Sequence, residues 1–154
     1  MKIKENKKAK NFKLNSTFSK PFELSKLKCG LVIYFYPKDN TPGCTLETID
    51  FSKLYKKFKN LKYEVVGISK DSIESHLGFK ERFKVPFQLL SDEKIQVQKK
   101  YGVWGMKSFL GKKFMGTIRS TIVINNKGKV LKIWSNVRVK GHAQEVLDFI
   151  KSSK

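Results

Sequence analysis

The chain has few cysteines and no long apolar run, and each shortage excludes a class of protein. Cys29 and Cys44 are the only cysteines in 154 residues, too few for a disulfide scaffold or for the four thiolates of a structural zinc site. No stretch approaches the roughly 18 consecutive apolar residues of a membrane span. No apolar run follows the first lysines, so we expect no secretory signal. These absences predict a soluble, cytoplasmic protein whose two cysteines need another explanation.

Arginine is also scarce, although the chain is strongly basic. Lysine and arginine number 33 against 13 acidic residues, for a formal net charge of +20, but the only arginines are Arg82, Arg119 and Arg138. A basic chain attracts phosphate backbones and anionic membrane surfaces nonspecifically. Dedicated nucleic-acid readers depend on the guanidinium fork, which lysine cannot imitate. We therefore interpret the charge as a solvated surface, with no dedicated nucleic-acid or membrane partner.

Alternating strand and helix patterns predict an α/β fold in a single domain covering residues 1–154. Continuous apolar runs at 31–36 and 63–69 are typical of strands buried in the centre of a sheet. Strands at 118–124 and 130–134, joined by a turn, are expected to form an antiparallel hairpin. The central sheet should therefore be mixed, because strands connected through helices run parallel. Helices should flank it on both faces.

The spacing of the remaining apolar residues predicts the helices. They are expected to start near Cys44, Asp71 and Asp92, with a final helix at the end of the chain. Residues 1–10 are polar and rich in lysine, which indicates a frayed lead-in. The glycines scattered over 102–116 lack the spacing of a phosphate-binding loop and indicate an irregular loop.

The segment Tyr36–Glu47, with the sequence YPKDNTPGCTLE, lies between the first buried strand and the first helix. In open α/β sheets, ligands bind where strand ends and helix N-termini converge. Cys44 is expected in the first helical turn, where unpaired N–H groups and the helix dipole favour the thiolate. A helix terminus contributes up to about 2 kcal/mol, so a further cation is needed. Arg119 is the candidate, because it interrupts an apolar strand where a charge needs a partner.

The other titratable candidates are expected to be structural. Turn and helix-start residues surround Cys44, which argues against an inert cysteine packed in the core. Cys29, in contrast, comes just before an apolar strand, and we interpret it as inert and buried or half-exposed. His76 lies on the inward side of its helix and His142 opens the last one, so both are predicted to pack rather than to act as bases.

The run from Tyr36 to Glu47 resembles the active-site signature of the peroxiredoxins, and in particular that of the bacterioferritin comigratory protein branch, also called peroxiredoxin Q. Further matches follow in the same order along residues 12–151, at 65–69, 86–92, 101–104 and 119–121. The resemblance implies a thioredoxin-like fold. It also implies a thiol peroxidase that reduces hydrogen peroxide and alkyl hydroperoxides through a cysteine sulfenic acid, without metal, haem or flavin.

The resemblance implies a role for five residues of this chain. Cys44 corresponds to the peroxidatic nucleophile. The hydroxyl of Thr41 would hydrogen-bond the thiolate and the peroxide, and Arg119 would stabilise the thiolate and the developing oxyanion. Pro37 would shield the pocket, and Glu47 would help to orient the arginine.

The chain departs from the family pattern because it has no resolving cysteine. Many relatives carry one five residues after the first, where this chain has Ile49, and others carry it on the next helix, where residues 71–83 contain none. A disulfide needs Cα atoms within about 7 Å, whereas roughly 20 Å of strand separates Cys29 from Cys44. We therefore predict a one-cysteine cycle in a monomer or weak dimer. Thioredoxin, glutaredoxin or glutathione would reduce the sulfenic acid.

Two other functions stay open at this point. A thiol–disulfide oxidoreductase on the same fold is disfavoured, because the paired cysteines of a C-x-x-C motif are missing. A basic nucleic-acid-binding module is disfavoured by the scarcity of arginine. Trp104 and Met106 could wall a pocket for organic hydroperoxides, or could equally form a surface or dimer contact.

Overall fold

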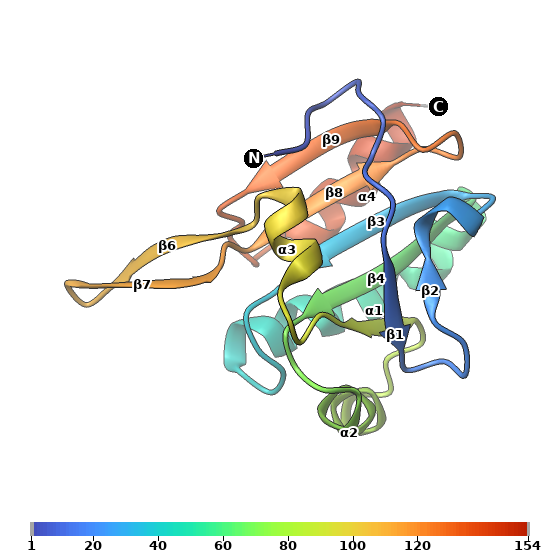
Figure 1. Cartoon of the computed structure of the whole chain (residues 1–154). Coiled ribbons are helices and arrows are strands. Elements are labelled where there is room, and N and C mark those ends of the chain that lie inside the picture. The colour runs from blue at the N-terminus through green and yellow to red at the C-terminus, as the bar shows by residue number, and fades with distance from the viewer. Residues whose placement is uncertain (1, 154) are drawn as a thin grey trace.

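A seven-stranded sheet forms the centre of the fold in the computed structural model, which describes residues 2–153 (Figure 1). The strand order is β2-β1-β5-β4-β3-β8-β9. The strands are β1 (Lys13–Ser16), β2 (Phe22–Glu23), β3 (Gly30–Phe35), β4 (Tyr63–Ser69), β5 (Gln88–Ser91), β8 (Ser120–Ile124) and β9 (Val130–Ser135). β4 pairs in parallel with β3 and β5, and the other neighbours pair antiparallel. The predicted mixed sheet is confirmed.

Helices cover both faces of this sheet, as predicted. They are α1 (Pro42–Asn60), α2 (Ile73–Phe83), α3 (Gln96–Tyr101), α4 (His142–Ser152) and the short 3-10 helix η1 (Leu24–Lys26). Buried residues of α1, α2 and α4 share one core cluster with one face of the sheet. Those of α3 pack on the opposite face together with the N-terminal segment (Figure 1). Within residues 2–153, no helix is both long and apolar enough to cross a membrane.

The two-sided covering explains the apolar run of β3, in which every residue is buried. Successive side chains of a strand point to opposite faces. Val32 and Tyr34 therefore pack towards α1, whereas Leu31 and Ile33 pack towards α3. A strand covered on both faces has no polar side, which is why the sequence shows no alternation here. The carboxyl end of β3 leads into the loop that precedes α1.

A β-hairpin replaces the irregular loop predicted for 102–116. β6 (Trp104–Phe109) and β7 (Lys112–Thr117) form a separate two-stranded sheet that projects from the body of the molecule (Figure 1). Leu110 and Gly111 join the strands with φ values of 51° and 78°, and a type I′ hairpin turn requires positive φ at both central residues. The prediction was wrong because most of the projecting hairpin is exposed, so its sequence carries no regular apolar alternation.

The N-terminal lead-in is not frayed, contrary to the prediction. Ile3 is buried in the core cluster on the α3 face. The backbone N–H of Asn6 donates to the carbonyl oxygen of Val130 at 2.7 Å, and Lys8 forms an isolated bridge with Lys129. One apolar residue among lysines has no periodicity, so the sequence pattern could not reveal that this segment docks on β9.

The helices begin close to the predicted positions, each within a few residues. Ser72, rather than Asp71, caps α2, because its hydroxyl accepts a backbone N–H of the first turn. α3 begins at Gln96 instead of Asp92. The Asp92 carboxylate still accepts the backbone N–H of Gln98 at 2.9 Å, so it caps that helix from a distance. Short polar side chains compete for these N–H groups, and spacing alone does not decide between them.

Candidate active site

Cys44 lies in the first turn of α1, at the carboxyl end of β3. The helix begins at Pro42, with Thr41 as its N-cap; proline suits this position because its missing N–H would have no helical partner there. Cys44 is buried and is a free thiol. Its sulfur therefore lies at the N-terminal end of a 19-residue helix, where unpaired N–H groups and the helix dipole favour an anion.

Arg119 supplies the cation expected beside this sulfur. Its Nη2 donates a hydrogen bond to Cys44 Sγ at 3.3 Å, and its Nη1 donates to Glu47 Oε1 at 2.7 Å. The side chain is 17% exposed and lies close over Gly43, where an added Cβ would be 3.4 Å from Nη2. Arg119 precedes β8, which starts at Ser120, rather than interrupting a strand as predicted. Its position still faces α1 because β8 is the neighbour of β3.

Glu47 is a buried carboxyl with only one oxygen satisfied. Oε1 accepts from Arg119, and Oε2 has no hydrogen-bond partner within the described part of the chain. Burial raises the pKa of Glu47 to about 7, although Arg119 opposes the shift. Burial also disfavours the charged form of Arg119, but Glu47 and Cys44 outweigh it and raise the pKa of Arg119. The guanidinium thus stays charged, while its carboxyl partner changes protonation near neutral pH.

Lys107 is a second cation of this site, and no pattern in the sequence indicated it. It lies on β6 and is half-buried. Burial lowers the pKa of Lys107, Arg119 lowers it further, and Cys44 acts in the opposite direction, so the ammonium group senses both neighbours. Its aliphatic part packs against Gly116, where an added Cβ would lie 3.1 Å from Lys107 Cδ. Lys107 differs from the many other lysines in its place on the β6–β7 hairpin, which the sequence pattern did not predict.

Thr41 and Pro37 lie in the segment between β3 and α1, but the Thr41 hydroxyl has a different partner from the one implied by the resemblance. Thr41 Oγ1 donates to the carbonyl oxygen of Lys38 at 2.9 Å instead of to Cys44. A nearby backbone acceptor competes for the single hydroxyl proton. Pro37 is half-buried and follows the end of β3. The contact between Thr41 and the sulfur stays a prediction.

A buried hydrogen-bond network holds this loop in place. The Asp39 carboxylate accepts from Tyr36 Oη at 2.6 Å and from Ser75 Oγ at 2.8 Å, and it lies 2.7 Å from His76 Nδ1. Asp39 and His76 are both buried. His76 Nε2 lies 2.9 Å from the carbonyl oxygen of Leu90. A carbonyl oxygen can only accept, so Nε2 carries a proton.

A further proton must therefore lie between His76 Nδ1 and Asp39 Oδ2, because two lone pairs would otherwise face each other at 2.7 Å. Together the two side chains form a neutral pair that joins the loop to α2 and β5. Asp71 adds a second link, since its Oδ2 accepts the backbone N–H of Asp39 at 2.8 Å and the Ser69 hydroxyl at 2.6 Å. His76 has a structural role, as predicted, but through hydrogen bonds rather than apolar packing.

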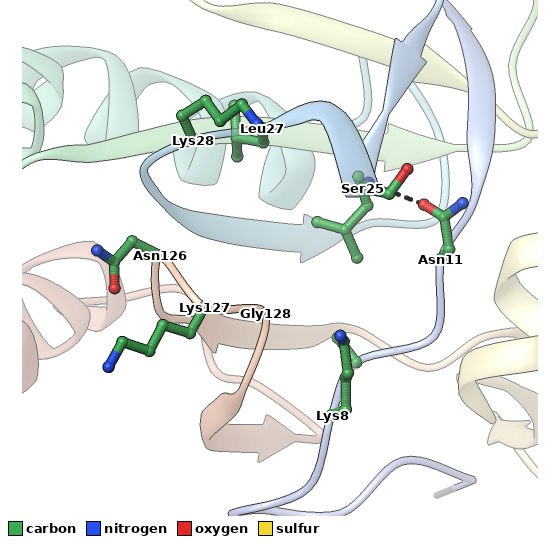
Figure 2. Close-up of a pocket in the computed structure, with 10 residues that line it drawn as sticks. Lys8, Asn11, Ser25, Leu27, Lys28, Asn126, Lys127 and Gly128 are labelled. Atoms are coloured by element: carbon green, nitrogen blue, oxygen red, sulfur yellow. Dashed lines mark hydrogen bonds between the residues drawn. The ribbon is translucent and has the colours of Figure 1, made fainter.

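Cys29 lies apart from this site, and so does a cavity on the surface. Cys29 comes immediately before β3, at the end of the strand opposite to the Cys44 loop, and both thiols are free. A cavity of about 290 Å³ opens between the N-terminal segment, η1 and the β8–β9 turn (Figure 2). Its lining includes Lys8, Lys28 and Lys127, and none of the candidate site residues.

Comparisons with known proteins agree with this geometry. The model of the AhpC/TSA family matches residues 6–133. Peroxiredoxin Bcp of Bacillus subtilis is 40% identical over 152 residues, which cover 98% of this chain and 97% of that protein. This relative supports the resemblance drawn from Tyr36–Glu47.

Solved structures give the same result. A structure of the bacterioferritin comigratory protein of Xanthomonas campestris, described for its alkyl peroxide reduction activity, matches with a TM-score of 0.87 at 35% identity and covers 92% of this chain and 91% of that one. PrxQ of Xylella fastidiosa matches with a TM-score of 0.92 at 33% identity, over 98% and 97%. These structures confirm the predicted thioredoxin-like fold.

Replacing His76 by leucine is expected to lower the free energy of unfolding by about 3 kcal/mol or more, because the Asp39 carboxylate and the Leu90 carbonyl would both lose a partner inside the core. Urea unfolding followed by circular dichroism measures the loss. Ser75→Ala is the matched control. It removes one hydrogen bond from the same carboxylate and should cost about 1 kcal/mol. Equal losses in the two variants would contradict the central place of His76 in the network.

Glu47→Gln is expected to change how stability depends on pH. The pKa of Glu47 is about 7 in the folded chain against an ordinary value of 4.5, so the folded state holds this proton more tightly than the unfolded state. Its contribution to stability is therefore complete below pH 4.5 and is lost as the pH rises towards 7. Glutamine has no such proton to lose.

The free energy of unfolding of the wild type, minus that of Glu47→Gln, should thus fall across this window and level off above it. Urea unfolding at a series of pH values measures the difference. A difference that stays constant with pH would show that Glu47 does not change protonation there.

Proposed function

Since this chain belongs to the AhpC/TSA family and is a peroxiredoxin, a thiol peroxidase on a thioredoxin-like fold, we propose that Cys44 is its peroxidatic cysteine within a single domain of residues 1–154. One observation carries the assignment: Arg119 Nη2 donates to Cys44 Sγ at 3.3 Å, at the N-terminal end of α1. A hydrogen-bond donor, a positive charge and a helix N-terminus at one sulfur all stabilise the thiolate relative to the thiol.

The reaction is a nucleophilic displacement at oxygen. The Cys44 thiolate attacks the terminal oxygen of the peroxide, so that an S–O bond forms while the O–O bond breaks. The electron pair of the O–O bond goes to the departing oxygen, which takes up a proton and leaves as water from hydrogen peroxide or as an alcohol from an alkyl hydroperoxide. The sulfur is oxidised to a sulfenic acid and the peroxide is reduced.

The neighbouring residues support this displacement. Arg119 stabilises the negative charge that develops on the departing oxygen, and Glu47 orients its guanidinium through the 2.7 Å hydrogen bond. Rotation about the Cβ–Oγ bond lets the Thr41 hydroxyl leave the Lys38 carbonyl and donate to the peroxide instead. Pro37, half-buried at the end of β3, shields the pocket from water.

An external thiol completes the cycle. It attacks the sulfenic acid sulfur, forms a mixed disulfide with Cys44 and releases water; a second thiol then restores the Cys44 thiol. Cys29 does not take this role because β3 lies between the two cysteines. Thioredoxin, glutaredoxin and glutathione are the reductants proposed. They are kept reduced in the cytoplasm, which is the proposed compartment, and the active form is a monomer or a weak dimer.

Arg119→Ala is expected to slow the oxidation of Cys44 by hydrogen peroxide at least ~10-fold, because a loss of about 1.4 kcal/mol of transition-state stabilisation already gives that factor. Stopped-flow mixing under single-turnover conditions measures the rate. Arg138→Ala is the control, since Arg138 is exposed and lies outside the site; its rate should equal that of the wild type. An unchanged rate in Arg119→Ala would remove the arginine from the mechanism.

One equivalent of hydrogen peroxide should convert Cys44 to a sulfenic acid that a sulfenate-specific reagent traps stoichiometrically. Mass spectrometry of the labelled peptide identifies the residue. Cys29→Ser should give the same yield, because Cys29 takes no part in the cycle. A stoichiometric intramolecular disulfide in the wild type, absent from Cys29→Ser, would overturn the one-cysteine cycle while leaving the peroxidase assignment intact.

A further inference from the structure

The β6–β7 hairpin has an exposed apolar tip. Phe109 is 66% exposed and Leu110 is 86% exposed, and Met106, Phe114 and Met115 along the hairpin are exposed as well. None of its residues belongs to either core cluster, and the hairpin extends away from the sheet into solvent (Figure 1). A projection that carries several exposed apolar side chains indicates an interaction site.

The backbone at Leu110 supports the same conclusion independently. Leu110 is the first turn residue and has a φ of 51°, a left-handed conformation that costs free energy for a leucine and is normally taken by asparagine or glycine. Its side chain gains no burial in return, because it is the most exposed of the large apolar residues described. Strained residues of this kind cluster at functional sites, so an exposed leucine in this conformation favours a function for the tip.

The charge of the hairpin indicates an anionic occupant. Lys112 and Lys113 directly follow the turn, and residues 104–117 contain no aspartate or glutamate. A second copy of the chain carries the same formal charge of +20 and would be repelled. The partner that binds the hairpin must therefore offer both an apolar environment and negative charge.

A bilayer with anionic headgroups meets both conditions. A convex tip needs a matching groove on a protein partner, whereas a bilayer surface accepts a protrusion anywhere. In a bilayer the phosphate headgroups lie above the hydrocarbon. An apolar tip can therefore reach the hydrocarbon while the lysines just behind it stay level with the phosphates.

We propose that the tip of the β6–β7 hairpin docks on anionic phospholipid bilayers. Phe109 and Leu110 enter the surface below the headgroups, and Lys112 and Lys113 contact the phosphates. A basic surface made mostly of lysine and the lack of a span predicted no membrane partner, but the hairpin brings charge and apolar side chains together on one projection.

Co-sedimentation of the full chain with vesicles tests the proposal. The wild type is expected to bind vesicles of phosphatidylglycerol mixed with phosphatidylcholine and not vesicles of phosphatidylcholine alone. The double variant Phe109→Ser with Leu110→Asn should bind the anionic vesicles at least ~10-fold more weakly. Asparagine suits the left-handed turn position, so the hairpin should stay folded. Leu77→Gln, which removes a 45% exposed leucine from α2, is the matched control and should bind like the wild type.

Two outcomes would overturn the proposal. Equal binding of the double variant and the wild type would assign the attraction to net charge alone. No binding of the wild type would exclude the bilayer, and a dimer in sedimentation velocity that the double variant lacks would then identify the tip as a self-association surface. Hydrogen peroxide consumption without vesicles should be equal in the wild type and the double variant, so a failure here is distinguishable from a failure of the proposed peroxidase site.

Discussion

The guanidinium of Arg119, bonded at once to Cys44 Sγ and Glu47 Oε1, is the interaction on which the candidate site depends. It joins the first turns of α1 to the segment that enters β8, and it can do so because β8 pairs with β3, whose carboxyl end leads to α1. Burial raises the pKa of Glu47 to about 7, so this carboxyl carries a full negative charge beside Arg119 only at higher pH. The sheet order, the start of α1 and the buried Glu47 carboxyl thus together determine the surroundings of the Cys44 sulfur.

The loop before α1 is held from the opposite direction by a second polar contact. The Asp39–His76 pair and the Asp71 carboxylate tie this loop to α2 and β5, while Arg119 ties the helix that follows to β8. Both links are hydrogen bonds inside the protein rather than apolar packing, and hydrogen bonds define direction as well as distance. The position of Cys44 is therefore determined by groups far apart in the sequence, brought together by the central parallel strands.

The sequence could predict those parts of the molecule that have a local pattern. The apolar run of β3 and the helical spacing of α1 predicted the sheet centre and its covering, and a charged residue next to an apolar run predicted Arg119 as the partner of Cys44. The Asp39–His76 pair could not be predicted, because the two residues are separated by 37 positions and no local sequence pattern links them. The β6–β7 hairpin and Lys107 escaped for a different reason: periodicity reports burial, and a projecting hairpin buries almost nothing. The roles of Thr41 and Pro37 stay predictions.

The length of β3 has a chemical consequence under the proposed cycle. Because Cys29 and Cys44 lie at opposite ends of this buried strand, an oxidised Cys44 has no neighbouring sulfur with which to condense. It must wait for a thiol from solution, and in that interval a second peroxide molecule can carry it on to the sulfinic acid, from which ordinary thiols do not recover it. Peroxide and the external thiol then compete for the sulfenic acid of Cys44. The fraction of the protein that escapes conversion to the sulfinic acid therefore depends on the ratio of oxidant to reductant around it.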